Sequence, residues 1–271
     1  MLANVALTDL VRHAALFPET DLPPPLPEHP SKQVRRDGYM VGLFPGRTHG
    51  TVSVEAVGAD DVERAVRDVR SLLAENGKAR GAWFVPEAAS PAGLAHDLRS
   101  LGMVPFDEPP LEPRFAAMAL VAAPEPGPPD IEARVAESFE EYQAGLRVSQ
   151  EAFAVSSEDR AALEGRERRL WEIEQSWGMY RSFVALIDGE VVGAAAVIHG
   201  ANAAFLAGGS TRADMRGRGV YRALVRARWD AGVARGTPAL TVGAGRMSRP
   251  ILEQLGFATV GCVDCLLDQF S

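Results

Sequence analysis

The clearest pattern of hydrophobic and polar positions lies in the second half of the chain. Residues 131–135 alternate apolar and polar side chains, as a half-buried strand does, and apolar residues then recur at helical spacing from Phe139 to Phe153. Polar and acidic residues at 156–159 predict the start of a second helix. The apolar face of that helix would consist of Leu163, Leu170, Ile173 and Trp177.

A meander of three strands and a further set of elements are predicted after these helices. Asp188-Gly189 and the residues 200–202 are turn sequences typical of antiparallel hairpins. The strands are expected at 183–187, 191–198, 203–207, 240–242 and 259–267, and helices after Gly219 and at 250–255. The order β-α-α-β-β-β-α-β-α-β predicts an α/β (α+β) fold with a mixed, mostly antiparallel sheet flanked by helices.

The first half of the chain repeats the end of this pattern. Strands are predicted at 51–57 and 83–85, with an amphipathic helix at 59–74 between them. A helix ending in Leu-Gly-Met at 101–103 then corresponds to one ending in Leu-Gly-Phe at 255–257. We interpret the two halves as two copies of one fold in tandem.

A proline-rich stretch separates the two halves. It follows an apolar, strand-like run at 115–121 and has proline at four of its residues, which excludes it from a helix or a central strand. The predicted division is therefore an N-terminal domain at 1–123, a linker at 124–130 and a C-terminal domain at 131–271.

The amino-acid composition limits which partners and which cellular compartment are expected. The 271 residues have a formal net charge of -8 and a pI near 5.2, so no nucleic acid is expected as the main ligand. Two cysteines, Cys262 and Cys265, are too few for a disulfide scaffold and favour a reducing, cytoplasmic setting. Asp9 and Arg12 interrupt the short apolar stretch at the start, so neither export nor membrane insertion is expected.

The segment from Gly208 to Leu224 is the most informative about chemistry. A predicted strand there enters a glycine-rich turn that opens a helix, which gathers unpaired backbone N–H groups and the positive helix end at one place. Gly217 and Gly219 allow close approach of a phosphate. The segment also carries basic side chains, which are Arg216, Arg218, Arg222 and Arg226, the last three at four-residue spacing. We expect an anion site that fits a pyrophosphate; a glycine turn followed by a solvated arginine-rich helix is the alternative.

Two nucleotide-binding motifs do not fit this segment. A Walker loop requires Lys-Ser/Thr after its glycines, whereas Val220-Tyr221 follows here. A Rossmann fingerprint opens a parallel βαβ unit, whereas this segment follows an antiparallel meander.

The motif Arg216-Gly217-Arg218-Gly219-Val220-Tyr221 resembles the central Arg-x-x-Gly-x-Gly/Ala motif of the GNAT acetyltransferase superfamily. The later segment 248–257, a short helix ending in Leu-Gly-Phe, also resembles a motif of that family, and the order of elements is similar over 131–271. Tyr221 departs from the Gly/Ala that the family has there.

The resemblance implies that acetyl-CoA, or another acyl-CoA, lies where the fourth and fifth strands separate, with no metal involved. Backbone groups at Gly209, Ser210 and Thr211 would pair with the pantetheine arm, which can add to a free strand edge. The pyrophosphate would be bound by Arg216, Gly217, Arg218, Gly219, Val220, Tyr221 and Arg222. A backbone N–H at the strand edge would polarise the thioester carbonyl.

The catalytic side chains depart further from the family's pattern. The tyrosine that many members use to protonate the leaving thiolate corresponds to Leu252 here, and the family's frequent asparagine corresponds to Gly245. Direct transfer requires little more than a positioned, deprotonated amine. We predict Glu151 as the candidate base and Ser248 as a hydroxyl near the sulfur.

Several other residues have simpler interpretations. Cys262 and Cys265 form a single CxxC pair on a predicted strand, where odd spacing places the thiols on opposite faces, so neither a zinc nor a redox site is expected. His199 is interpreted as a turn residue remote from Gly208. Trp171 and Trp177 are expected to pack in the core, with an acceptor pocket as the alternative.

The N-terminal half lacks the arginine-glycine segment. Gly58-Ala59-Asp60-Asp61 stands in its place, and acids at a helix start repel a phosphate and cap the helix, so this half should not bind CoA. It would instead shape the acceptor site or a homodimer interface. The arrangement resembles tandem members of the superfamily with one degenerate copy, of which mycothiol synthases are one group.

The resemblance and the composition together imply a cytoplasmic N-acetyltransferase that acts on a primary amine of a small molecule or peptide. The acidic composition is compatible with a cationic acceptor. A non-catalytic acyl-CoA sensor, or an enzyme for a longer acyl chain with room at Gly208 and Gly209, is the alternative.

Overall fold

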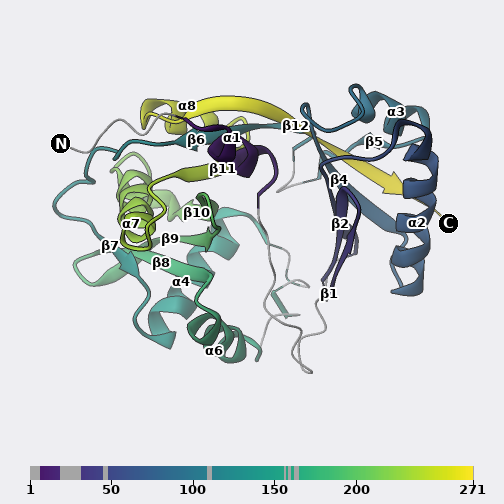
Figure 1. The fold of residues 1–271 in the computed structure, drawn as a ribbon. Coiled ribbons are helices and arrows are strands. Elements are labelled where there is room, and N and C mark those ends of the chain that lie inside the picture. The colour runs from purple at the N-terminus through teal and green to yellow at the C-terminus, as the bar shows by residue number, and fades with distance from the viewer. Residues whose placement is uncertain are drawn as a thin grey trace. The chain divides into compact units, whose positions relative to one another are not determined.

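The computed structural model describes residues 7–18, 32–44, 48–108, 112–155, 157, 160–161 and 165–270. The chain forms two compact units (Figure 1). As far as they are described, the larger unit holds residues 1–20, 118–243 and 247–258, and the smaller unit holds 21–117, 244–246 and 259–271.

From β7 to α8 the larger unit follows the element order expected from the sequence. Its elements are α1 (Asp9–Leu16), the end of β6 (Arg114–Leu120), β7 (Glu132–Val135), α4 (Phe139–Ala152), α6 (Glu167–Trp177), β8 (Tyr180–Ile187), β9 (Glu190–His199), β10 (Ala204–Thr211), a 3-10 turn η2 (Ala213–Met215), α7 (Val220–Ala234), β11 (Leu240–Ala244) and α8 (Arg249–Gln254). Neighbouring strands follow the order β6-β11-β10-β9-β8-β7. The strands β7 to β10 pair antiparallel and β10 pairs with β11 in parallel, which confirms the mixed, mostly antiparallel sheet.

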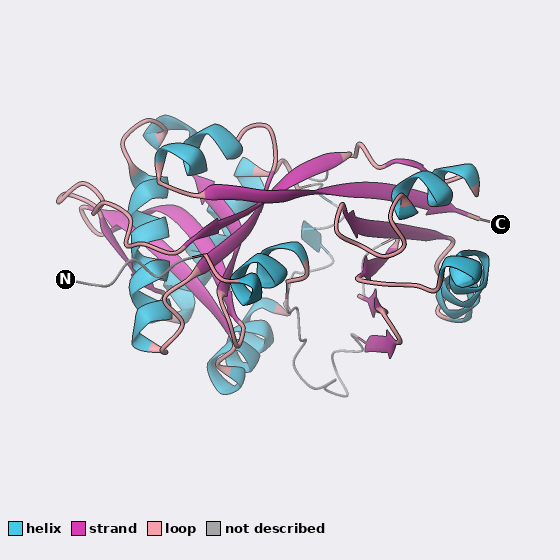
Figure 2. Cartoon of the chain, turned by 45° about the horizontal axis from the view of Figure 1, so that its top comes forward, coloured by secondary structure: helices cyan, strands magenta, loops and turns pink. Residues whose placement is uncertain are grey.

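Helices cover both faces of this sheet (Figure 2). A Cβ on Gly145 of α4 would stand 3.3 Å from the Ala194 side chain, whereas a Cβ on Gly193 would stand 2.4 Å from Val220 of α7. Adjacent strand residues point to opposite faces, so α4 and α7 lie on opposite sides of β9. Glycine at 145 and 193 permits both helices to approach the sheet closely.

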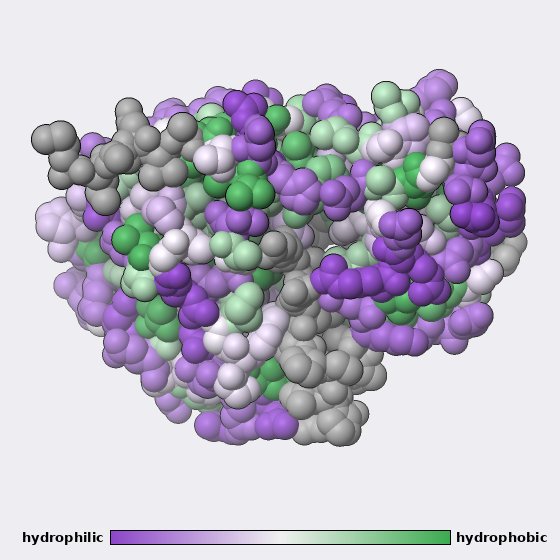
Figure 3. Space-filling model, in the orientation of Figure 1, coloured by the Kyte–Doolittle hydropathy of each residue, from purple (hydrophilic) through white to green (hydrophobic). Residues whose placement is uncertain are grey.

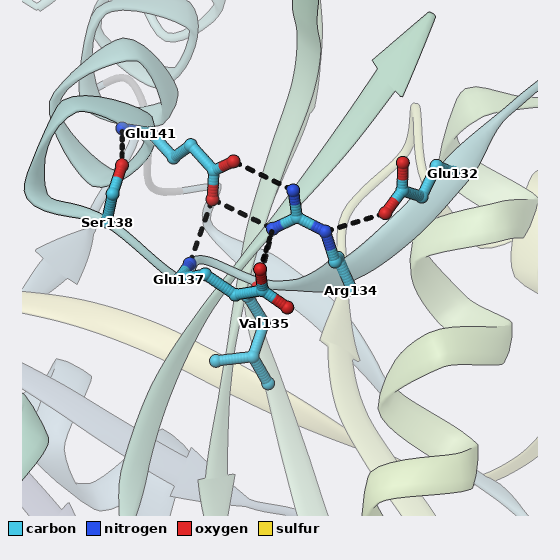
Figure 4. A network of polar contacts seen from close by, with 6 residues as sticks. All are labelled: Glu132, Arg134, Val135, Glu137, Ser138 and Glu141. Atoms are coloured by element: carbon cyan, nitrogen blue, oxygen red, sulfur yellow. Dashed lines mark hydrogen bonds and ion pairs between the residues drawn. The ribbon is translucent and has the colours of Figure 1, made fainter. Parts of the chain in front are cut away.

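The turn between β7 and α4 is fixed by a polar network (Figure 4). Ser138 caps α4 by accepting a hydrogen bond from the Glu141 N–H at 3.2 Å. The Glu141 carboxylate accepts two hydrogen bonds from Arg134, each 2.8 Å long, and one from the Glu137 N–H. These bonds lower the pKa of Glu141 to about 2, chiefly through Arg134.

The smaller unit repeats part of this architecture. Its elements are β1 (Lys32–Arg36), β2 (Tyr39–Leu43), β3 (Gly50–Val54), the 3-10 turn η1 (Ala59–Asp61), α2 (Val62–Glu75), β4 (Arg80–Pro86), α3 (Leu94–Ser100), β5 (Val104–Pro105), the first part of β6 and β12 (Ala258–Gln269). An antiparallel pair leads into two parallel strands joined by a helix, in the series β2, β3, α2, β4, as in the series β9, β10, α7, β11. The tandem interpretation is confirmed by this repeat. Its core centres on Trp83 and Leu73, both almost fully buried.

One expectation for the smaller unit is wrong in detail. The acid at the start of its helix does not cap it, because the Asp61 carboxylate pairs with Arg64 at 2.8 Å and makes no capping hydrogen bond.

The strand that comes last in each repeat along the sequence lies beside strands of the other repeat. β12 follows α8 along the chain, yet it pairs antiparallel with β4 from Val263↔Pro86 to Gln269↔Arg80. β6, which follows β5, lies next to β11. A buried Asp268, 1% exposed, is bonded by Arg70 at 2.7 Å within the smaller unit. The compact units therefore interleave along the sequence, whereas the linear division at 124–130 stays a prediction.

The proline-rich stretch at 124–130 packs along α7. A Cβ on Gly127 would stand 2.6 Å from the Ala223 side chain, and Pro128 lies against Gly219 at the start of the helix. The predicted capping residues Ser156, Glu158 and Asp159 and the predicted helix residue Leu163 lie outside the described residues.

Within the described residues, the helices are all too short or too polar to cross a membrane. Hydrophobic and hydrophilic residues are interspersed on the face drawn in Figure 3. Large exposed apolar side chains, such as Met247 at 82% exposure, are few and scattered along the described chain.

Candidate cofactor-binding site

The strands β10 and β11 separate soon after they begin. They pair in parallel at Ala204↔Leu240 and Phe205↔Thr241, and no further pair follows although both strands continue. The register of β10 against β9 shifts between Ala207 and Ser210, which marks a β-bulge. From the bulge onward, the edge of β10 that faces β11 therefore forms no strand pairs. The resemblance implies that acyl-CoA lies at such a separation of the fourth and fifth strands.

β10 extends further than the sequence suggested. The expected glycine-rich turn at Gly208 is wrong, because β10 continues through Gly208 and Gly209 to Thr211, and the Arg212 N–H donates to the Val192 carbonyl at 2.9 Å. The bulge makes this extension possible, since Gly208 adopts a positive φ of 57° that glycine tolerates without strain.

A run of backbone N–H groups faces outward where β10 passes into α7. Within the described residues, none of the six N–H groups from Gly217 to Arg222 donates to an acceptor in the chain, whereas the Ala223 N–H donates to the Gly219 carbonyl at 3.0 Å. Gly217 and Gly219 have φ of 78° and 87°, which turns successive N–H groups toward one side. Apart from Gly217 and its two chain neighbours, the described residues have no atom within 4 Å of the position of a Cβ on Gly217, so the approach is open. The arrangement fits a pyrophosphate.

The arginines of this segment form two groups, according to whether they make an ion pair. Arg218 pairs with Asp130 at 3.2 Å, and Arg226 pairs with Asp230 at 2.9 Å and donates to the Pro124 carbonyl. The guanidinium of Arg226 is thus bound against the stretch 124–130, and its part in the phosphate site stays a prediction. Arg216 and Arg222 have no carboxylate partner in the described part of the chain. Arg222 folds back over the helix start, with its Nη2 3.5 Å from the Cβ position of Gly219.

Tyr221 packs against the bulge. Its ring carbon Cε2 lies 2.5 Å from where a Cβ of Gly209 would stand, so the missing side chain of Gly209 makes room for this ring. The aromatic ring points toward β10, and the N–H groups at the helix start remain open. Tyr221 therefore does not crowd the anion site, although it replaces a small residue of the resembled motif.

A pair of serines closes the other face of the bulge. The buried Ser210 hydroxyl lies 3.2 Å from the Ala194 carbonyl and donates to it, and it lies 3.0 Å from the Ser149 hydroxyl of α4. The Ser210 hydroxyl has a single proton, which it donates to the Ala194 carbonyl. The Ser149 hydroxyl is therefore the donor in the contact between the two serines. Thr211, which follows, pairs with Gly193 of β9.

Arg228 of α7 lies fully buried below Tyr221. Its Nε donates to the Leu224 carbonyl at 3.0 Å and its Nη1 to the Ala196 carbonyl at 3.1 Å, while Nη2 has no hydrogen-bond partner within the described residues. Burial lowers the pKa of Arg228, and the Tyr221 phenol counteracts part of that effect. Sequence spacing gives no signal for this residue, because an arginine in a helix ordinarily lies in solvent.

The two predicted catalytic residues lie on the last turn of α4 and at the start of α8. Glu151 is exposed on the last turn of α4, two positions beyond Ser149, so it projects from a different side of the helix. Ser248 is half-buried at the start of α8, and its carbonyl accepts from the Leu252 N–H. Leu252 itself is fully buried in the core. The roles of Glu151 and Ser248 stay predictions.

The remaining singled-out residues have structural settings. His199 ends β9, as expected for a residue at the turn, and burial lowers its pKa to about 4. Cys262 and Cys265 are free thiols, and burial raises the pKa of Cys265 to about 12. Trp171 packs on the apolar cluster around Tyr142. Among the described residues, no group of three His, Cys, Asp or Glu side chains is arranged to hold a metal ion.

Comparison with solved structures shows that the chain has the GNAT N-acetyltransferase fold. It is similar to a GCN5-related N-acetyltransferase from Kribbella flavida at 19% identity and a TM-score of 0.65, over 88% of this chain and 89% of that one. It is also similar to a tandem GNAT protein from the clavulanic acid biosynthesis pathway at 15% identity and a TM-score of 0.61, over 85% of this chain and 78% of that one. No family model and no curated protein matches the sequence. The fold expected from the motifs is thereby confirmed.

Proposed function

We propose that this protein is an acetyl-CoA-dependent N-acetyltransferase that transfers the acetyl group directly to a primary amine of a small molecule or peptide. The observation that carries the proposal is the run of six N–H groups from Gly217 to Arg222 that find no acceptor in the described part of the chain, next to the unpaired edge of β10. An anion site at a helix start and a free strand edge beside it suit a ligand that joins a pyrophosphate to an amide chain.

Each part of the site has a distinct task in this proposal. The N–H groups and the guanidiniums of Arg216 and Arg222 bind the pyrophosphate. Backbone groups of Gly209, Ser210 and Thr211 pair with the pantetheine amides, and an N–H at the bulge polarises the thioester carbonyl. Bound acetyl-CoA supplies the activated acetyl group. Glu151 and Ser248 are the residues we propose for proton removal from the amine and for contact with the sulfur.

Thermal unfolding with acetyl-CoA tests the cofactor site. At one hundred times the dissociation constant, the ligand should add about 2.7 kcal/mol to the stability of the wild type. Arg216→Gln and Arg222→Gln should reduce this gain, since each removes a guanidinium that pairs with no carboxylate among the described residues. Arg12→Gln, an exposed arginine on α1, is the matched control and should retain the full gain. A wild type that acetyl-CoA does not stabilise would refute the proposal.

A non-catalytic acyl-CoA sensor is the second candidate, favoured by one observation. Leu252, which stands where the resembled family often has a tyrosine acid, is fully buried and has no ionisable group. A thiol reagent that follows release of free CoA separates the two candidates, with a polyamine, an aminoglycoside and a peptide amine as acceptors. Release above the rate without amine supports the enzyme, and tight binding with no release for any amine supports the sensor.

A further inference from the structure

The bulge of β10 depends on its surroundings for its shape. Gly208 and Gly209 stand together opposite Ala195 of β9, so the regular pairing of the two strands is interrupted there. Neither glycine has a side chain that could anchor it, and glycine has more backbone freedom than any other residue. The geometry of the bulge is therefore set by the groups that bind the strands on either side of it.

Two side chains bind β9 next to the bulge. The Ser210 hydroxyl donates to the Ala194 carbonyl at 3.2 Å, and Arg228 donates through Nη1 to the Ala196 carbonyl at 3.1 Å. Ala194 pairs with Ser210 after the bulge, and Ala196 pairs with Ala207 before it. The two donors come from opposite faces of β9, because Ser210 also contacts α4 and Arg228 belongs to α7. The bulge is thus held at both ends and from both faces of the sheet.

Arg228 also lies level with the point where β10 and β11 separate. Nearer the start of α7, the Tyr221 ring packs against Gly209, and nearer its end a Cβ on Gly232 would stand 3.8 Å from the Ala204 side chain. Arg228 lies between these two contacts along the helix. The pairs between β10 and β11 end at the second residue of β10, so the guanidinium supports the strand where its free edge begins.

The fold itself gives no reason for a cation at this position. The Arg228 side chain is 1% exposed, it pairs with no carboxylate among the described residues, and its Nη2 has no hydrogen-bond partner there. Replacing a buried charge by an apolar side chain of similar volume is often neutral or stabilising. An apolar side chain would fill the same space, but it would not bind the Ala196 carbonyl from α7.

We propose that Arg228 is a positioning residue that fixes the bulge of β10 from the α7 side, and with it the backbone N–H that polarises the thioester carbonyl. This inference rests on the proposed function. An N–H that donates to the carbonyl oxygen draws electron density toward that oxygen and makes the carbonyl carbon more electrophilic. A donor that is already held in place needs no rearrangement when negative charge grows on the oxygen. Arg228 therefore acts through the bulge and does not touch acetyl-CoA.

The infrared stretch of the bound thioester carbonyl tests this role and needs no acceptor amine. Acetyl-CoA with an isotopic label at the carbonyl carbon is bound to the protein, and its band is compared with that of the free compound. A hydrogen bond to the carbonyl oxygen lowers the frequency, so the wild-type complex should absorb at a lower frequency. Arg228→Met, which keeps a similar volume and removes the donors, should lose more than half of this shift.

Two further variants show whether the effect belongs to the bond with β9. Arg228→Lys keeps a donor for the Ala196 carbonyl and should give an intermediate shift. Arg235→Met, which changes an exposed arginine directly after α7, is the matched control and should keep the full shift. Calorimetric titration with CoA, which lacks the carbonyl, should give equal affinities for all four proteins, because Arg228 is eight residues beyond Val220, about 12 Å along α7 from the pyrophosphate site.

The outcomes separate this role from the proposed function. A full shift in Arg228→Met, an equal loss in Arg235→Met, or a loss of CoA affinity in Arg228→Met overturns the role of Arg228 and leaves the proposed function standing. If thermal unfolding shows that Arg228→Met does not fold, Arg228→Lys decides, and a shift equal to that of the wild type overturns the role. A wild type that binds acetyl-CoA without any shift overturns the role and leaves the cofactor site in place. Failure of the wild type to bind acetyl-CoA overturns both.

Discussion

Replacing Glu141 with glutamine should destabilise the protein at neutral pH and much less in acid. The Glu141 carboxylate accepts two hydrogen bonds from Arg134 and one from the Glu137 N–H, which lowers its pKa from 4.5 to about 2 (Figure 4). That difference corresponds to about 3 kcal/mol at pH 7. Solvent reaches the side chain, which is 22% exposed, so we expect about 2 kcal/mol.

The stability that Glu141 contributes should depend on pH in a definite direction. A carboxyl group whose pKa is lowered on folding contributes stability that is fully present above the unfolded value of 4.5 and is lost as the pH falls toward 2. The difference between wild type and Glu141→Gln should therefore shrink to less than half near pH 3. Urea unfolding of both proteins at pH 7 and pH 3 measures this difference in the free energy of unfolding.

A neighbouring carboxylate provides the control. Glu132 bonds the Nε of the same Arg134 at 2.7 Å but is 65% exposed. Exposed pairs contribute little, so Glu132→Gln should change the free energy of unfolding by less than about 1 kcal/mol at either pH. Equal losses for the two variants, or a loss in Glu141→Gln that does not depend on pH, would refute the reasoning.

Two further predictions concern the candidate site. Asp130→Asn frees Arg218 from its 3.2 Å ion pair, so the dissociation constant for acetyl-CoA should fall by about twofold to fivefold in calorimetric titration; an unchanged or weaker affinity would show that Arg218 does not meet the phosphates. Gly209→Val places a Cβ 2.5 Å from the Tyr221 ring, so the variant should lose about 1–3 kcal/mol in thermal unfolding, and adding Tyr221→Ala should recover most of it. A loss that persists in the double variant would mean that the strand, and not the ring, rejects the side chain.

Local periodicity was sufficient to predict most of the fold. Strict alternation at 131–135 and the turn Asp188-Gly189 gave strands and a hairpin that the structure contains, because both signals depend on neighbours in sequence. The hairpin of β1 and β2 was not predicted. Its first strand, Lys-Gln-Val-Arg-Arg at 32–36, is mostly polar, although the Asp37-Gly38 dipeptide between the strands is a signal that indicates such a turn.

The candidate site was predictable only in its backbone features. The glycines and the helix start could be placed because a chain must bend there whatever surrounds it. The division of the arginines could not, since Arg218 finds its carboxylate partner 88 positions away at Asp130. Nor could the burial of Arg228, which follows from how α7 lies on the sheet and not from any pattern along the helix.

The placement of β12 has a consequence for how the protein is made. The edge of β4 pairs with residues 263–269, and Arg70 meets its partner Asp268 198 positions later. Residues 263–269 must therefore be synthesised before β4 can complete its sheet, and until then β4 presents an open edge of the kind that promotes aggregation. Loss of residues 263–269 would accordingly damage a sheet whose other strands are synthesised much earlier.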